Sequence, residues 1–405
     1  MKIRSKSISL LTAGALTLNI LYSNCSEFSP GLQPSLSSPS TEQNPPQNSS
    51  DCTSGQLADL EASIKTTLAT VATDTDFSIA IRTEDGRSLE FDRGSVTQLT
   101  RFESASTSKW VAASTILLFM ESPENQSSSK PLTLNSLISD FLSSSEWPIS
   151  STDPLSKITM RHLLSFTSGL KEESLCFNRP GFDFAECVKE IAINNDGNGL
   201  VPGQTFWYSG SHLQTAAMVA IKARNIAFGV SNSTWQNLFT DFRSKTGLFP
   251  TSKFDLPSES NPRIASGMHW IGVEYLDFVR SNYNRQILSD QPMPGESKTY
   301  LDQQFSDQTA GASIGSSPAI RIGEDWHYGF GTWFECRSAS FNCGSTPDAN
   351  SSPGAYGAYP FLNRKYKYYG MLARQGDTSS FSDGYDVFKS ISKDLNTWAS
   401  KSCSP

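Results

Sequence analysis

The sequence predicts an α+β fold in which an antiparallel sheet is built from the two ends of the chain. Strand patterns lie near both ends, at 77–92 and 328–374, whereas the residues between them have the pattern of helix and loop. An amphipathic helix flanks the strands on either side. We therefore expect residues 126–315 to form an inserted, mostly helical domain, with the active site at its junction with the sheet, where pockets tend to lie.

The helices at the two ends are identified by apolar residues that recur at helical spacing. They are Leu57, Leu60, Ile64, Leu68 and Val71 in the first helix, and Val387, Phe388, Ile391, Leu395 and Trp398 in the last. The first two strands, Phe77–Arg82 and Ser88–Asp92, flank an Asp85-Gly86 turn and predict a hairpin. Later strands are expected near 328–335, 355–362 and 366–374, which gives a five-stranded antiparallel sheet.

Composition argues against two classes of function. The chain of 405 residues has 33 basic and 40 acidic residues, a net charge of −7 and no basic run, so nothing indicates a nucleic-acid partner. The histidines are far apart in the sequence and lack the spacing of metal ligands. They are His162, His212, His269 and His327. We expect no metal and no cofactor.

The amino terminus has the pattern of an export signal. Basic residues precede an apolar stretch from Ile8 to Leu21, which is too short to span a membrane comfortably. Cys25 then ends a segment that resembles a relaxed bacterial lipoprotein cleavage site, with ordinary signal cleavage as the alternative. Residues 25–52 are rich in Ser, Pro, Asn and Gln and predict a flexible tether. We expect residues 1–24 to be a signal peptide and the protein to be periplasmic or on the cell surface, anchored to a bacterial membrane by a lipid on Cys25.

The most informative feature is Ser106 with Lys109 three positions later, at the start of an apolar helix. Positions i and i+3 share one face of a helix, so the lysine points toward the serine. A serine hydroxyl is a poor nucleophile until a neighbour takes its proton, and a lysine amine in a desolvated site can do so. S-x-x-K is the nucleophile motif of the penicillin-binding enzymes. Taken alone, the pair also fits an ordinary helix start with a solvated lysine.

Two further segments make a resemblance specific. Residues 158–170, ITMRHLLSFTSGL, are similar to the ITxRHLLxxTSGL signature of the serine β-lactamase-related family, which includes class C β-lactamases, D-alanyl-D-alanine carboxypeptidases and β-lactamase-like esterases. Residues 201–218 resemble the family's PGxxFxYSN element, whose tyrosine is the second catalytic base, and the match assigns that role to Tyr208. His162 lies inside the first of these motifs, and we expect it to be a structural, hydrogen-bonding residue.

The chain departs from the family just after Tyr208. Gly210 stands where the family has an asparagine that helps to hold the lysine and the substrate amide, which puts amide recognition in doubt. Ser209 or Ser211 could substitute for that asparagine in part.

The family's third motif, K-T-G or H-x-G, lies between two late strands, and the segment from Ser352 through Pro353 to Gly354 fits that position. Gly354 permits a substrate to approach the backbone closely, and the resemblance implies that the Ala355 amide forms an oxyanion hole with the Ser106 amide. The first position of the motif has no lysine or histidine, so no cation for a substrate carboxylate is evident. The rival position for this motif is the segment 374–376, which begins with the cation Arg374. A motif there would leave too little chain after it for a further strand and the last helix.

The resemblance covers about residues 55–400 and implies a β-lactamase/penicillin-binding-protein-like fold. Residues 53–125 and 316–405 are then the two parts of the α/β domain, separated by the insertion. It also implies two-step acyl transfer, in which Lys109 and Tyr208 manage the proton of Ser106. We expect an exported serine hydrolase that is a monomer and acts on small-molecule esters, with amides as the second class of substrate. The alternatives are a D-Ala peptidase or β-lactamase, and a catalytically weak surface lipoprotein that serves as a binding module.

The cysteines fit an exported protein, because an oxidising location permits disulfides. Of the seven, six remain if Cys25 carries a lipid, and six allow fifteen connectivities. Locality pairs Cys176 with Cys187 and Cys336 with Cys343. Cys52 and Cys403 are left, and they would meet if the first and last helices pack antiparallel, as in this fold.

Overall fold

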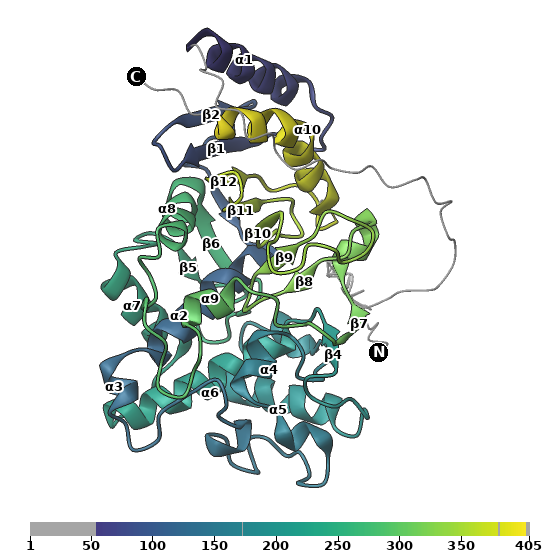
Figure 1. The fold of residues 1–405 in the computed structure, drawn as a ribbon. Helices are drawn as coiled ribbons and strands as arrows, with labels where there is room; N and C mark the ends of the chain where they lie inside the picture. The colour runs from purple at the N-terminus through teal and green to yellow at the C-terminus, as the bar shows by residue number, and fades with distance from the viewer. Residues whose placement is uncertain (1–53, 172, 380, 402–405) are drawn as a thin grey trace, which may run out of the picture.

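A computed structural model describes residues 54–171, 173–379 and 381–401 of the chain (Figure 1). An antiparallel sheet joins strands from both ends of the sequence, with the two terminal helices on one side and most of the other helices on the opposite side (Figure 1). The α+β fold expected from the sequence is thus confirmed. The predicted signal peptide, 1–24, and tether, 25–52, lie outside the described residues, as do Cys52 and Cys403. Within the described residues, no helix is both long and apolar enough to cross a membrane.

The main sheet has the strand order β2-β1-β12-β11-β10-β9-β8. The first hairpin is confirmed, because β1 and β2 pair antiparallel with Ile81 opposite Leu89. β1 also pairs with β12, which brings strands from the two ends of the chain side by side in the sheet. The strands are β1 Ser78–Thr83, β2 Ser88–Asp92, β8 His327–Tyr328, β9 Trp333–Glu335, β10 Ala349–Ser351, β11 Tyr359–Asn363 and β12 Tyr368–Ala373.

The sheet contains seven strands among the described residues, where the sequence predicts five. The predicted strand 328–335 is two short strands, β8 and β9, joined by a tight turn in which the Gly329 amide donates to the Thr332 carbonyl at 2.8 Å. β10 was not expected, because its three residues are too few to show a period and two of them are polar. The predicted strand 355–362 begins later, at Tyr359, because residues 354–357 form a turn.

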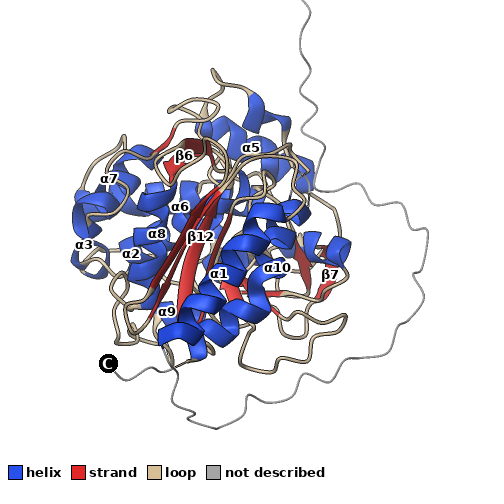
Figure 2. Ribbon diagram, turned by 90° about the horizontal axis from the view of Figure 1, so that it is seen from above, coloured by secondary structure: helices blue, strands red, loops and turns tan. Residues whose placement is uncertain are grey.

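The terminal helices α1 (Ser54–Thr70) and α10 (Phe381–Ser400) pack against each other on one face of the sheet (Figure 2). Hydrogen bonds pair Ser63 with Asp394 at 2.9 Å and Glu61 with Trp398 at 3.0 Å. Because the later residue of α1 pairs with the earlier residue of α10, the two helices run antiparallel. The other face of the sheet is covered by α8 (Gly272–Tyr283), so the inserted region supplies one layer of the sheet's own packing.

The helix that follows the nucleophile motif, α2 (Ser108–Met120), lies at the centre of the helical region, and all of its 13 residues are buried. It packs against α6 (Ser211–Phe228) and α7 (Trp235–Thr246). The other α-helices of this region are α3 Pro123–Gln126, α4 Met160–Leu164, α5 Phe184–Asn195 and α9 Tyr300–Gln304. Short 3-10 helices are η1 Ala105–Thr107, η2 Ile138–Asp140, η3 Pro154–Lys157, η4 Leu175–Asn178 and η5 Pro318–Ile322.

Two small sheets connect the helical region to the site. β3 (Arg101–Glu103) and β5 (Lys253–Phe254) pair with β6 (Met268–Ile271) on either side, and β3 leads directly toward Ser106. β4 (Thr205–Trp207) pairs parallel with β7 (Ser313–Ser316), and β4 ends immediately before Tyr208. Both small sheets therefore fix the backbone next to a candidate catalytic residue.

Two of the predicted disulfides are confirmed. Cys176 is bonded to Cys187, with their Cα atoms 5.4 Å apart, and Cys336 is bonded to Cys343, with a separation of 5.7 Å. The pairing of Cys52 with Cys403 stays a prediction. It is compatible with the described ends of α1 and α10, where Gln56 accepts a hydrogen bond from Lys401 at 3.2 Å.

Candidate active site

Ser106 lies in η1, the single 3-10 turn that joins β3 to α2. The sequence had placed it in the first turn of the α-helix itself, which begins two residues later. The preceding residue, Ala105, has φ of 42°, a left-handed conformation that is costly for a residue with a side chain. Hydrogen bonds hold the turn on both sides, because the Ser104 amide donates to Met268 O at 2.8 Å and the Tyr275 hydroxyl donates to Thr107 O at 2.7 Å.

Lys109 points at Ser106, as the i, i+3 spacing predicts. Its Nζ lies 2.8 Å from Ser106 Oγ and 3.1 Å from the carbonyl oxygen of Ala265. The lysine is buried, with 4% of its surface exposed. The Ala265 carbonyl therefore holds the amine beside the serine in a site that is largely shielded from water.

Tyr208 completes the group of three. Its ring lies under the lysine, with Nζ 4.7 Å from the ring centroid, and stacks on Trp333 with centroids 5.0 Å apart. The backbone is fixed where β4 ends, because the Tyr208 amide donates to Ser316 O at 3.0 Å. The fold thus brings Tyr208 to Ser106 and Lys109 across about a hundred residues of sequence.

The expected third-motif residues reach the same place. Ser352, directly after β10, donates from Oγ to Ser106 O at 3.2 Å. Gly354 packs so closely on the nucleophile turn that a Cβ there would lie 2.7 Å from Ser104 O, which explains the glycine. The Gly354 amide donates to Ala358 O at 2.9 Å, whereas the Ala355 amide makes no hydrogen bond within the described part of the chain. The Ala355 N–H can therefore donate a hydrogen bond to a substrate in the pocket that Ser106 also lines.

At Gly210, where the family has an asparagine, the carboxylate of Glu173 lies beside the backbone. The Gly210 amide donates to Glu173 Oε1 at 2.6 Å, and a Cβ on Gly210 would lie 3.2 Å from that oxygen. Ser209 is buried, and its Oγ accepts a hydrogen bond from the Ser211 amide at 3.2 Å, so it serves the start of α6. Glu173 could not be predicted from the sequence, because no local pattern links it to a glycine 37 positions later.

A pocket with a cavity volume of about 80 Å³ opens over the nucleophile. Its described lining residues are Ser106, Tyr208, Pro318, Arg321, Trp333, Pro353, Gly354, Ala355, Thr378, Ser379 and Phe381. Arg321 was not expected there, and it is the one residue of that lining that carries a permanent charge. Arg374, the cation of the rival segment 374–376, does not line the pocket. Its side chain is fully buried and is bonded to Asp74 and to Thr73 Oγ1.

Two histidines support the site without lining it. His162 Nδ1 accepts from the Thr159 amide at 3.2 Å in a capping box at the start of α4, and burial lowers its pKa. His212 accepts from Ser168 Oγ at 2.7 Å and donates from Nε2 to Trp207 O at 2.8 Å, so both of its bonds use the neutral ring. Burial lowers the pKa of His212 to about 3. The structural role expected for His162 agrees with these contacts.

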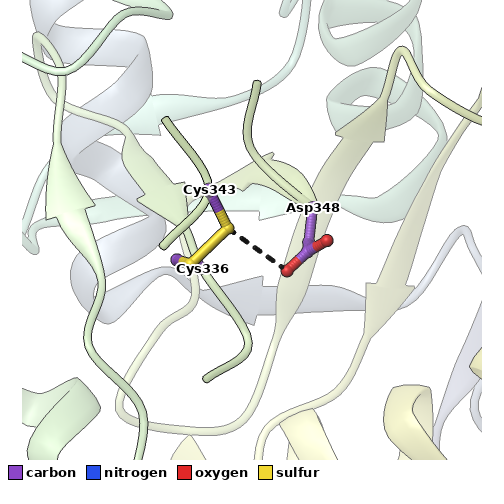
Figure 3. A group of neighbouring side chains, drawn as sticks. All are labelled: Cys336, Cys343 and Asp348. Atoms are coloured by element: carbon purple, nitrogen blue, oxygen red, sulfur yellow. Dashed lines mark hydrogen bonds between the residues drawn. A yellow bond between two sulfur atoms is a disulfide. The ribbon is translucent and has the colours of Figure 1, made fainter. Parts of the chain in front are cut away.

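One group of side chains has the composition of a metal site (Figure 3). It consists of Cys336, Cys343 and Asp348, whose candidate ligand atoms lie within 4.8 Å of one another. The two sulfur atoms are joined in a disulfide, however, and a metal binds the thiolate form of cysteine. Asp348 accepts a hydrogen bond from the Arg337 amide at 2.9 Å. These bonds therefore hold together the loop between β9 and β10.

Comparisons with known proteins agree with this geometry. The β-lactamase family profile matches residues 79–219, which contain Ser106, Lys109 and Tyr208. A search of curated proteins found no match. Among solved structures, a protein of Bacteroides dorei DSM 17855 assigned as a β-lactamase is 21% identical, with a TM-score of 0.60 over 83% of this chain and 98% of that one.

Two enzymes show the same fold at lower identity. EstCE1, a hydrolase with promiscuous acyltransferase activity, is 14% identical, with a TM-score of 0.58 over 86% of this chain and 99% of that one. The D-amino acid amidase of Ochrobactrum anthropi SV3 is also 14% identical, with a TM-score of 0.56 over 84% of this chain and 99% of that one. At these identities the similarity establishes the fold.

Proposed function

We propose that this chain is an exported esterase of the β-lactamase family that works through an acyl-enzyme on Ser106. The observation that carries the proposal is the 2.8 Å contact between Lys109 Nζ and Ser106 Oγ, at the edge of a pocket that Tyr208 also lines. A nucleophile and its base within hydrogen-bond reach are the signature of covalent catalysis.

The first step is attack by Ser106 Oγ on the ester carbonyl carbon. The hydroxyl proton passes to the neutral amine of Lys109, 2.8 Å away. The carbonyl oxygen becomes an oxyanion, which the amides of Ser106 and Ala355 stabilise by hydrogen bonds. The bond to the leaving oxygen then breaks, and the alcohol departs with a proton that Lys109 supplies through the Tyr208 hydroxyl.

The second step releases the acid. Water attacks the acyl-enzyme carbonyl while the Lys109 and Tyr208 pair accepts its proton, and the Ser106 oxygen leaves and is reprotonated. The close packing of Lys109 over the Tyr208 ring keeps the two proton-carrying groups together through both steps.

Esters are favoured over amides because of Gly210. The family's asparagine at this position presents a side-chain amide to the substrate, whereas the residue nearest the empty Cβ position here is the carboxylate of Glu173. An ester needs only the nucleophile and the oxyanion hole. The second candidate is a D-Ala peptidase or β-lactamase, and the presence of Arg321 in the pocket favours it, because those substrates carry a carboxylate.

Export and anchoring are part of the same proposal. The confirmed disulfides suit an oxidising compartment, and the amino-terminal sequence supplies a candidate signal and a lipid acceptor at Cys25. We place the mature protein at a bacterial membrane surface, as a monomer with a small-molecule substrate.

Two probes test the proposed function. The purified protein and its Ser106→Ala variant are treated with a fluorescent fluorophosphonate and with a fluorescent penicillin, and the labelled peptide is identified. Labelling of Ser106 by the phosphonate alone supports the esterase, and labelling by both supports the penicillin-recognising alternative. Labelling by neither supports a binding module and overturns both catalytic proposals.

A further inference from the structure

A buried carboxylate lies close to the site but takes no part in the proposed mechanism. Glu335, the last residue of β9, is 0% exposed. The Arg337 guanidinium pairs with its Oε2 at 3.1 Å, and the hydroxyls of Ser351 and Tyr359 both donate to its Oε1, that of Tyr359 at 2.7 Å. Burial raises the pKa of Glu335, against the opposing effect of the Arg337 charge and the two hydroxyl donors. Removing an ion from water is costly even when partners satisfy it, so stability alone does not account for a carboxylate at this position.

β10, the strand that bonds to Glu335, has little else to fix its register. It consists of Ala349–Ser351, and only two of these residues pair with β11. All three are buried and two are polar, so no alternation of apolar and polar side chains selects one pairing over another. The Asn350 side chain adds hydrogen bonds to two backbone carbonyls, at 3.2 and 3.3 Å, which are longer than usual. A slip of one residue would turn Ser351 to the other face of the sheet and away from Glu335.

The segment that follows β10 forms one wall of the active site. Ser352 donates from Oγ to Ser106 O at 3.2 Å, and the Ala355 amide is the second donor of the proposed oxyanion hole. Gly354, between them, is in close contact with the nucleophile turn, where a Cβ would lie 2.7 Å from Ser104 O. Because Ser352 directly follows the last residue of β10, a shift of that strand moves the whole segment relative to the nucleophile.

We infer that Glu335 is a positioning residue, which fixes the register of β10 through Ser351 and thereby the place of the Ala355 amide in the oxyanion hole. The inference rests on the proposed function, because an oxyanion hole matters only if Ser106 is acylated. Trp333 lies opposite Ser351, and Glu335 is two residues further along β9 on the same face, so the hydrogen bond crosses the two strands diagonally. A buried polar group that specifies one register at a cost in stability is a well-attested use of such residues.

Loss of this hydrogen bond should act on the transition state rather than on substrate binding. The donors of an oxyanion hole stabilise charge that develops only during the reaction, and complete removal of one such donor lowers kcat by about 10²–10³-fold. A displaced donor keeps part of its effect, so we expect kcat and kcat/KM both to fall by about tenfold, with KM nearly unchanged. The affinity for phenylboronic acid should fall by a similar factor, because its adduct with Ser106 places an oxygen in the oxyanion hole.

The test compares Ser351→Ala with Ser252→Ala. Both serines are fully buried and both donate to a buried glutamate, since Ser252 Oγ bonds to Glu274 Oε2 at 2.5 Å. Ser252 directly precedes β5 and does not line the pocket. The measurements on each protein are kcat and KM for 4-nitrophenyl acetate, the Kd of phenylboronic acid, and the melting temperature.

Ser351→Ala should show the tenfold losses, whereas Ser252→Ala should melt at a lower temperature and keep both kcat and the affinity for the boronate. A double-mutant cycle connects the effect to Glu335. If Glu335 and Ser351 act as one unit, Glu335→Leu/Ser351→Ala should lose no more in kcat than Glu335→Leu alone. Unchanged kcat in Ser351→Ala, an equal loss in Ser252→Ala, or losses that multiply in the double variant would overturn the inference.

A second pair of variants decides the question if Ser351→Ala does not fold. Tyr359→Phe removes the other hydroxyl donor to Glu335, and Tyr368→Phe is its control, because Tyr368 is also fully buried but donates to Asn396 at 2.9 Å. Tyr359→Phe should lower kcat and Tyr368→Phe should not, and equal kcat in the two overturns the inference. If the unaltered chain neither hydrolyses the ester nor is labelled by the phosphonate, the proposed function has failed, and this inference fails with it.

Discussion

Ser106 and Lys109 depend on the structure around them to different degrees. The amine of Lys109 is buried and bonded to both Ser106 Oγ and the Ala265 carbonyl, whereas Ser106 lines an open pocket. Removing the lysine side chain leaves the carbonyl without its donor in a dry site, which is costly for folding as well as for chemistry. Removing the serine hydroxyl affects the chemistry almost alone.

Ser106→Ala should abolish ester turnover and leave the thermal transition nearly unchanged, because a hydroxyl at a pocket wall contributes little to packing. Hydrolysis rates and calorimetry on the same preparation measure both effects. Ser104→Ala is a useful comparison, since Ser104 is fully buried and its Oγ accepts from the Met268 amide at 3.0 Å, so that variant should melt lower. Ester hydrolysis retained in Ser106→Ala would remove Ser106 as the nucleophile.

Lys109→Ala should lower kcat by about 10²–10⁴-fold, which is the usual contribution of a general base. Steady-state rates over a range of pH are the measurement. Lys222→Ala is the matched control, because Lys222 pairs with Glu146 at the edge of α6 and does not line the pocket. Turnover in Lys109→Ala equal to that of the unaltered chain would show that the S-x-x-K spacing is accidental.

Sequence patterns reveal site residues that belong to a local motif. Ser106 and Lys109 could be predicted because one turn of helix sets their geometry, and Tyr208 because it lies in a recognisable segment. Glu173 and Arg321 could not, because tertiary packing alone brings them to the site, from a loop and from the short 3-10 helix η5, which have no pattern of their own. Tertiary packing also decides the place of Arg374, the cation of the rival segment 374–376, which pairs with Asp74 just after β12.

The secondary-structure elements show a similar division. Long elements with a clear period, such as α1, α10, β1 and β12, follow from the sequence. β8, β9 and β10 are two or three residues long, and their pairing depends on neighbours in the sheet, so periodicity could not separate or locate them. β10 is nonetheless the element that delivers Pro353, Gly354 and Ala355 to the pocket.

Mass mapping of non-reduced peptides should link Cys176 with Cys187, Cys336 with Cys343, and Cys52 with Cys403. The third link is expected because α1 and α10 run antiparallel, so the N-terminal end of α1 lies near the C-terminal end of α10. The fully reduced sample is the control. A Cys52–Cys176 link would contradict the arrangement of the terminal helices, because Cys176 belongs to the helical region.

For the molecule as a whole, buried histidines connect folding to pH. His212 has a pKa of about 3 in the folded state, well below the unfolded value of about 6.5, because it is buried. The unfolded chain therefore binds the proton between these two values, and protonation favours unfolding. The stabilisation is complete above pH 6.5 and is lost as the pH falls toward 3. Lowered carboxyl pKa values, such as that of Glu146 at about 2, act in a lower range that overlaps this one, as the pH falls from about 4.5 toward 2.

The free energy of unfolding should decrease by about 1.4 kcal/mol per pH unit for His212 between pH 6 and pH 4, with a smaller share from His162, whose pKa is also lowered. Denaturant titrations at several pH values measure the slope. His212→Gln should be less stable at pH 7 and should show a flatter profile over the same range. An unchanged slope in that variant would assign the acid sensitivity to other groups.

The central claim is that Ser106 carries the acyl group during turnover. The most direct test is to mix the full chain with 4-nitrophenyl acetate, quench with acid in the first turnover, and locate the acetyl group by mass spectrometry of the peptides. We predict a burst of nitrophenol and an added acetyl group on Ser106, with none on that peptide in Ser106→Ala. Acetyl on a different residue, or turnover with no acylated peptide at any quench time, would contradict the acyl-enzyme mechanism.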